Sequence, residues 1–197
     1  RRRREIETRG LLSPGLCEQT GLAKILGKMQ IAEPIFSKER LLPPEILCGR
    51  LPSFDSTNLE DVRRAFQSAV SCPLRQAWLD EEEIGFSPAV ARAGWRENSL
   101  LVFAGLTDIE IFNDATRLNQ RAWELGDVFE IFLRAEEKEN YVELQITPDN
   151  QRLQLCFPDG RAVEMMRKNG GLEKFMIWDE AFFSRTWIEN GQWQIYA

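Results

Sequence analysis

The stretch from residue 127 to 157 constrains the fold most, because its side chains alternate between apolar and polar with the two-residue period of a β-strand. In the segment that begins at Asp127, this alternation sends Phe129 and Ile131 to one face and Glu130 to the other. A carboxylate in mid-strand must reach solvent or find a partner, because burying it alone is costly. The apolar face therefore belongs to a core, and Glu130 belongs to the opposite face.

The segment Tyr141–Pro148 repeats the alternation more cleanly. Its apolar side chains, Val142, Leu144 and Ile146, are expected to face inward. Its polar side chains, Glu143, Gln145 and Thr147, are expected to face outward. Upstream, the run Ser99–Asp108 is apolar on both faces, which is typical of a central strand. We expect strands at all three places, with the acidic and amide side chains of the second facing away from the core.

Turn signals join these strands into hairpins. Asp149-Asn150 links the second strand to Gln151–Phe157, and Arg96–Ser99 separates two apolar runs. Asn190-Gly191 is the strongest signal, since this pair favours the type I′ turn of a two-residue hairpin. Many short strands joined in this way predict an all-β protein. We expect an antiparallel β-sandwich of the jelly-roll or immunoglobulin-like kind over residues 50–197.

One short helix is expected near residues 58–68. Thr57 and Glu60 match a capping box, with Thr57 as the N-cap, and apolar side chains follow at helical spacing. A strand around Leu74–Leu79 should come next. Residues 1–49 lack regular patterning and are predicted to be an irregular N-terminal extension.

Composition excludes several classes of protein. The formal net charge of −6 argues against nucleic acid as a main partner, because phosphate binding needs a basic surface. No apolar run approaches the ~20 residues of a transmembrane helix. No signal peptide is visible either: Arg1–Arg4 could serve as its basic region, but Glu5, Glu7 and Arg9 interrupt the apolar segment that should follow.

Histidine is absent, which removes much catalytic chemistry. A Ser-His-Asp triad, a Cys-His pair and His-ligated zinc or iron cannot be built. A haem would lack its usual histidine ligand, so no redox cofactor is expected. The four cysteines have no Cys-x-x-Cys spacing, which gives no support to a zinc knuckle. Cys156 is expected to be a small buried thiol, and no disulfide is predicted.

Trp123 and Glu130 indicate a binding function. A flat aromatic ring beside a carboxylate suits a sugar, which offers C–H patches for stacking and hydroxyl groups for charge-assisted hydrogen bonds. Trp123 follows a long polar loop, Asp108–Arg121, of the kind that carries recognition on a rigid scaffold. Glu143 and Gln145 face outward on the adjoining strand. The candidate ligand-binding residues are therefore Trp123, Glu130, Glu143 and Gln145.

These motifs resemble those of the family 9 carbohydrate-binding modules and of the wider DOMON-like group of β-sandwiches. The shared pattern is an apolar strand ending in Asp, a variable loop, a Trp, an Asp-x-Val-Glu-Ile-Phe strand, and a strand that ends near Asn-Pro. The corresponding residues here are Asp108, Trp123, Asp127, Glu130, Ile131, Phe132 and Thr147-Pro148. The resemblance covers residues 50–197, and Gly126 departs from it as an extra residue between Trp123 and Asp127.

The resemblance implies a non-catalytic domain that binds mono- or oligosaccharides. Such modules are usually fused to or associated with exported polysaccharide-degrading enzymes, which implies an extracellular or periplasmic location. In those modules further strands follow and supply a second stacking Trp, so we expect that the domain either continues beyond Ala197 or lacks this second aromatic wall. In the same modules the position around Glu143 can be a basic or amide residue, and the acid here departs from that.

Other functions stay open. A glycosidase could use Glu130 and Glu143 as its carboxylate pair, since side chains on neighbouring strands can lie at the ~5–9 Å that such chemistry needs. A structural or protein-interaction domain could keep the fold without binding sugar. Two places offer the hard oxygen ligands that calcium prefers. The acidic run Asp80–Glu83 is either a solvated loop or a calcium site, and Asp108 and Asp127 either cap turns or bind a structural calcium.

Overall fold

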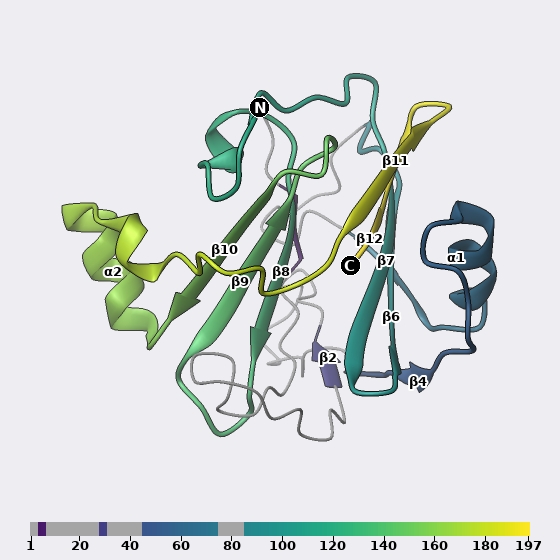
Figure 1. Ribbon diagram of the computed structural model, residues 1–197, viewed down its shortest axis with the longest axis horizontal. Coiled ribbons are helices and arrows are strands. Elements are labelled where there is room, and N and C mark those ends of the chain that lie inside the picture. Colours follow the sequence, from purple (N-terminus) through teal and green to yellow (C-terminus); the bar gives the residue numbers. More distant parts are fainter. Residues whose placement is uncertain (1–3, 7–27, 31–44, 75–84) are drawn as a thin grey trace.

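The computed structural model describes residues 4–6, 28–30, 45–74 and 85–197. Two β-sheets make up most of this part of the chain, and an α-helix lies beyond each of them (Figure 1). The mostly β character predicted from the alternating segments is confirmed. The expectation of one short helix is wrong, because the described residues contain two.

The larger sheet has six strands in the order β11–β12–β7–β6–β4, with β5 also paired to β6. Its strands are β4 (Gly49–Arg50), β5 (Ser71–Pro73), β6 (Ala89–Arg96), β7 (Ser99–Thr107), β11 (Arg185–Glu189) and β12 (Gln192–Tyr196). Neighbours are antiparallel except β4, which runs parallel to β6. The predicted Asn190-Gly191 hairpin is present, with the positive φ angles of 52° and 70° that a type I′ turn needs.

The smaller sheet has the order β1–β8–β9–β10. Its strands are β1 (Arg4–Ile6), β8 (Phe129–Arg134), β9 (Tyr141–Ile146) and β10 (Arg152–Phe157). The last three form an antiparallel meander, and β1 adds parallel to β8. Separately, β2 (Lys28–Gln30) pairs with β3 (Glu45–Leu47). The extension expected to be irregular therefore contributes three short strands where it is described.

The two sheets share one hydrophobic core. Phe129 and Ile131 of β8 belong to the same buried cluster as side chains of β6, β7 and β12. The members from β9 are Val142, Leu144 and Ile146, as its alternation predicts. Burying each large aliphatic or aromatic side chain contributes roughly 1.5–3 kcal/mol, so this shared cluster is what holds the sheets together.

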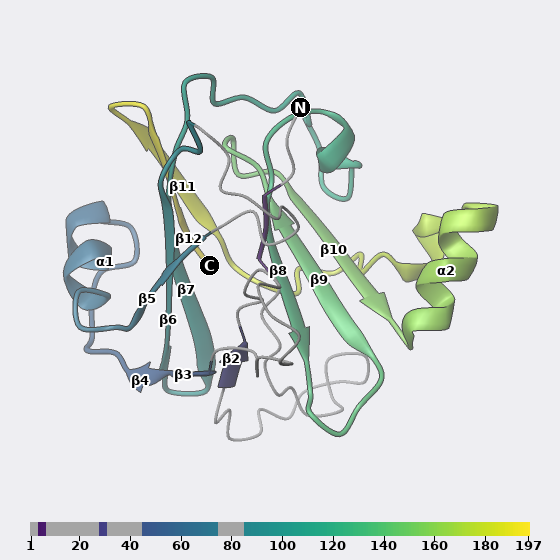
Figure 2. The same cartoon turned by 180° about the vertical axis from the view of Figure 1, so that it is seen from behind.

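Helix α1 (Leu59–Ala65) covers the outer face of the six-stranded sheet (Figure 2). It confirms the helix predicted near residues 58–68. Phe66, which ends it, packs against Phe103 of β7 and Tyr196 of β12 with ring centroids 5.6 and 6.4 Å away. A second apolar cluster therefore lies on the far side of this sheet from the shared core.

The first turn of α1 corrects the predicted cap. Asn58 is the N-cap, because its side-chain oxygen accepts hydrogen bonds from the backbone N–H groups of Glu60 and Asp61 at 3.0 and 3.2 Å. The Thr57 hydroxyl instead donates to Asp55 at 2.7 Å. Either side chain could have capped the helix, and the pairing of Thr57 with Asp55 leaves the role to Asn58.

Two further elements differ from the predictions. A strand was expected around Leu74–Leu79, but β5 lies just before that range, at Ser71–Pro73. Leu74 is outside the strand, and residues 75–79 lie outside the described residues. Helix α2 (Gly160–Asn169) follows β10 and begins at the N-cap Asp159, whose side chain accepts from Ala162 N–H.

The cysteines also correct a prediction. Cys48 and Cys72 are free, whereas Cys156 forms a disulfide whose partner lies outside the described residues. The expectation of a free thiol at Cys156 is therefore wrong. Spacing along the chain could not show this, because a disulfide depends on the distance between two Cα atoms in the fold.

Candidate functional site

Three of the four predicted site residues form a hydrogen-bonded group on the outer face of the smaller sheet. Glu130 on β8 and Gln145 on β9 are directly opposite in the register. The Nε2 atom of Gln145 donates to Glu130 Oε1 at 2.7 Å and to Glu143 Oε1 at 2.6 Å. One amide therefore joins two carboxylates from neighbouring strands, and we call Glu130, Glu143 and Gln145 the amide–carboxylate cluster.

Burial divides this cluster into an inner and an outer part. Glu130 is 1% exposed and Gln145 is fully buried, whereas Glu143 keeps partial exposure. All three face away from the shared core, as predicted, but only Glu143 reaches the surface. Hydrogen bonds to a carboxylate are about twice as strong as neutral ones, which is how a strand can carry Glu130 in a buried position.

Apolar side chains beside the cluster account for part of this burial. In β10, Leu153 and Leu155 lie opposite Gln145 and Glu143 in the register and so share the outer face. They pack with Leu172 from the 3₁₀-helix η2 (Leu172–Phe175) in a separate hydrophobic cluster. The outer face of the smaller sheet therefore has two parts. Its β10 side carries a second hydrophobic cluster, and its β8–β9 side carries the polar amide–carboxylate cluster.

Trp123, the fourth predicted residue, lies in the 3₁₀-helix η1 (Ala122–Glu124). It is partly buried and packs against the apolar cluster of β10 and η2. Asn113 positions η1, because its side-chain amide donates to the carbonyls of Ala122 and Asp127 at 2.9 Å each. The described contacts of Trp123 are therefore with apolar side chains. The amide–carboxylate cluster is held together by Gln145.

Aromatic residues that sequence reasoning missed line the exposed end of the same face. Phe132 of β8 lies opposite Glu143, and its ring centroid is 6.3 Å from that of Tyr141. Tyr141 in turn stacks on Phe157 of β10 with centroids 5.3 Å apart. Phe132 and Tyr141 are partly exposed. The two-residue period placed them on the same face as Glu130 and Glu143, so the signal was present in the sequence.

The two aspartates considered for calcium act as caps of backbone turns. Asp108 accepts hydrogen bonds from the N–H groups of Ile109 and Glu110, and Asp127 accepts one from Phe112 N–H at 3.0 Å. No group of three or more acidic or cysteine side chains in the described part of the chain could hold a metal ion. The acidic run Asp80–Glu83 lies outside the described residues.

Comparison with known proteins adds no relative: no family model, no curated protein and no solved structure matches this chain. Among the helices of the described residues, none has the length and apolar character needed to cross a membrane.

Proposed function

We propose that this chain is a non-catalytic carbohydrate-binding domain that resembles the family 9 modules and has a β-sandwich of the jelly-roll or immunoglobulin-like kind. The observation that carries the proposal is the partly exposed Glu143 carboxylate, fixed by Gln145 and flanked by Phe132 and Tyr141. A held carboxylate can accept hydrogen bonds from sugar hydroxyl groups, and the rings offer apolar surface to the C–H faces.

The geometry supports recognition at the edge of the cluster. Glu130 and Gln145 are too buried to touch a sugar, so their role is to orient Glu143 from below. Trp123 borders the apolar part of the same face and could extend the contact to a longer saccharide. A preorganised carboxylate loses less side-chain entropy on binding than a free one, which favours affinity.

We propose binding without catalysis, in preference to a glycosidase. A pair of catalytic carboxylates must both reach the glycosidic bond, and Glu130 is 1% exposed. Reducing-sugar release from plant or bacterial polysaccharides by the purified protein, abolished by Glu130→Gln, would overturn this part of the proposal.

Calorimetric titration against a panel of mono- and oligosaccharides tests the binding function. We expect dissociation constants between millimolar and micromolar, because one aromatic surface and a few charge-assisted bonds must offset the entropy of association. Glu143→Gln should weaken binding about tenfold or more. Glu97→Gln, in the exposed turn between β6 and β7 of the other sheet, makes the same charge change away from the site and should leave affinity unchanged. Equal affinity of both variants would move the site elsewhere.

An interaction domain without sugar binding is the second candidate. Three large apolar side chains between η2 and the end of β11 are exposed: Trp178, Phe183 and Ile188, at 65%, 53% and 50%. Exposed apolar side chains of this size are a feature of protein-binding surfaces. No heat of binding to any saccharide of the panel, with the protein folded throughout, would favour this candidate.

A further inference from the structure

Strand β11 is the last strand of the six-stranded sheet, and no described residue pairs with its other side. In Figure 1 it lies in front of β12 and β7, at the near edge of that sheet. Its register with β12 is regular, without a bulge, and its residues include neither proline nor lysine. Proteins usually protect an edge strand with such features, because an unprotected edge can pair with another chain. The free edge of β11 is therefore suited to strand addition.

The hydrogen bonds of β12 show which backbone groups this edge offers. Ala197 exchanges two backbone hydrogen bonds with Val102, at 2.8 and 2.9 Å, on the β7 side of β12. Bonding alternates along an antiparallel strand, so Tyr196 and every second residue before it bond to β11 instead. Their partners in β11 are Arg185, Trp187 and Glu189. The N–H and C=O groups of Thr186 and Ile188 therefore point to the free edge, where no described residue bonds to them.

The two ends of β11 carry opposite charges on the outer face of the sheet. Trp187 packs in the cluster of that face, and the two-residue period places Arg185 and Glu189 beside it. Arg185 forms no ion pair among the described residues. Glu189 bonds to Arg63 through Oε2 at 3.2 Å, and its side chain is half exposed. Each charge can therefore take a further partner of opposite sign.

We propose that two copies of this chain associate through the free edges of β11, antiparallel and about a two-fold axis at Trp187, into one continuous sheet. In this register Thr186 lies opposite Ile188 of the second copy, so the unbonded backbone groups of both residues face each other and can exchange hydrogen bonds. The two-fold axis repeats this pair on the other side of Trp187, which makes the interface self-complementary. The inference goes beyond the proposed function and does not depend on it.

Charge selects both the occupant and its direction. With Trp187 opposite its own copy, Arg185 lies opposite Glu189 of the second copy at each end of the paired strands. Opposite charges directly across a strand pair are stabilising, and like charges are destabilising. A parallel pairing of the same strands would instead bring arginine next to arginine and glutamate next to glutamate. The antiparallel dimer also covers part of Ile188, which is 50% exposed in the single chain.

Sedimentation velocity over a range of protein concentrations tests the proposal. A short edge-to-edge interface is small, so we expect a dimer with a dissociation constant of about 10–100 µM. Arg185→Glu and Glu189→Arg should each weaken dimerisation about tenfold or more, because each sets like charges opposite one another. An equimolar mixture of these two variants should dimerise as well as wild type, since every facing pair then has opposite signs.

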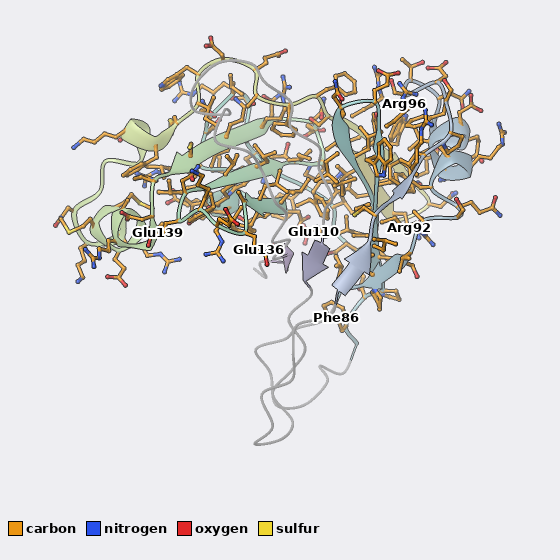
Figure 3. All side chains as sticks on the ribbon, turned by 90° about the horizontal axis from the view of Figure 1, so that it is seen from below. Phe86, Arg92, Arg96, Glu110, Glu136 and Glu139 are labelled. Carbon is orange, nitrogen blue, oxygen red and sulfur yellow. The ribbon has the colours of Figure 1, made fainter. Side chains whose placement is uncertain are left out.

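Two controls make the same charge reversals away from β11 (Figure 3). Arg96→Glu, on β6, removes a guanidinium that lies 5.1 Å from the ring centroid of Phe54. It matches Arg185→Glu, since the Arg185 guanidinium lies 5.6 Å from the ring centroid of Phe183. Glu136→Arg, in the exposed loop between β8 and β9, matches Glu189→Arg. Both controls should dimerise like wild type.

Hydrogen exchange of wild type at low and high protein concentration gives a test that needs no variant. The Thr186 and Ile188 amides should be protected about tenfold more above the dissociation constant, because they gain acceptors only in the dimer. The Trp187 and Glu189 amides already bond to β12, so they should change little and serve as internal references.

The outcomes decide the proposal in either direction. A monomer at every concentration, or equal exchange of the Thr186 and Ile188 amides at low and high concentration, would overturn it. A dimer that survives both Arg185→Glu and Glu189→Arg, or folded variants that do not dimerise on mixing, would overturn it as well. If either variant fails to fold by thermal unfolding, the exchange of wild type decides alone. None of these results bears on saccharide binding, which the titrations test separately.

Discussion

Gln145 donates a hydrogen bond to Glu130 from the directly opposite position on the neighbouring strand, with 2.7 Å between Nε2 and Oε1. Both side chains are at least 99% buried. The same amide nitrogen also bonds to the more exposed Glu143 at 2.6 Å. The amide of Gln145 therefore supplies the hydrogen bond that the buried Glu130 carboxylate needs. The same residue also orients Glu143, so one side chain affects both the stability of the sheet and the candidate site.

Replacing Gln145 with leucine should destabilise the protein by about 2–3 kcal/mol, because two hydrogen bonds to carboxylates are lost and one of them is fully buried. Urea unfolding of wild type and variant measures the difference. Gln192→Leu, at an exposed position on β12, makes the same change and should stay within about 0.5 kcal/mol of wild type. A loss no larger for Gln145→Leu than for this control would refute the structural role of the amide.

The faces of β8 and β9 could be read from the sequence because the two-residue period is a local property of the backbone. Every inward residue predicted for β9 belongs to the shared core. The burial of Glu130 could not be read in the same way, because the side chains that close its face come from other segments. In β10, Leu153 and Leu155 turn outward and Gln154 turns inward, so hydrophobicity alone would have assigned that strand the wrong face.

Helix α2 was not predicted, although it is amphipathic. Its apolar side chains Ala162, Val163 and Met166 pack against the cluster of β10 and η2, and none of its residues is fully buried. The open position at Gly105 was equally invisible, because the sequence does not show that Gln194 and Val90 lie opposite it on the neighbouring strands. Such positions depend on the register of three strands, which no single segment encodes.

Gly126 should be irreplaceable even by alanine. Its φ angle is 151°, and a Cβ atom there would lie 2.4 Å from the carbonyl oxygen of Phe112. We expect Gly126→Ala to cost about 2–4 kcal/mol or to prevent folding, through backbone strain together with the clash. Gly105→Ala is the matched control, since it meets nothing within 4 Å and should be neutral or stabilising. Thermal unfolding of both variants gives the comparison, and similar midpoints would contradict the packing around Gly126.

Cys72 should make the protein less stable in alkaline solution. Burial, and secondarily the nearby Cys48 thiol, raise the pKa of Cys72 from 9.0 to about 11, against a smaller lowering by Arg92. Between pH 9 and about 11 the folded protein therefore keeps the Cys72 thiol proton, whereas the unfolded chain releases it. Its contribution to stability is complete below pH 9 and is lost as the pH rises toward the folded pKa near 11. The free energy of unfolding of wild type should fall more steeply over this range than that of Cys72→Val, which cannot titrate. Parallel slopes would show that the Cys72 pKa is not raised.

Gln154 should control the order of the segment that follows η2. Its side chain is fully buried and donates to the carbonyls of Ile177 and Asp179 at 3.0 Å each, while its Oε1 accepts from Ala181 N–H at 2.9 Å. The backbone oxygen of Gln154 separately accepts from Ile177 N–H at 2.9 Å. Asn119 also donates to the Ile177 carbonyl and Arg152 to the Phe182 carbonyl, but the Gln154 amide is the group that bonds to Asp179 and Ala181.

Gln154→Leu removes the three side-chain bonds and keeps the backbone bond. In hydrogen exchange, the Ala181 amide should therefore lose most of its protection, whereas the Ile177 amide should remain protected and serve as an internal reference. Gln154→Glu retains an acceptor for Ala181 N–H but has no donor for the two carbonyls, so it should fall between leucine and wild type. If Ala181 exchanges as slowly in Gln154→Leu as in wild type, the segment is held by its apolar contacts and not by this amide.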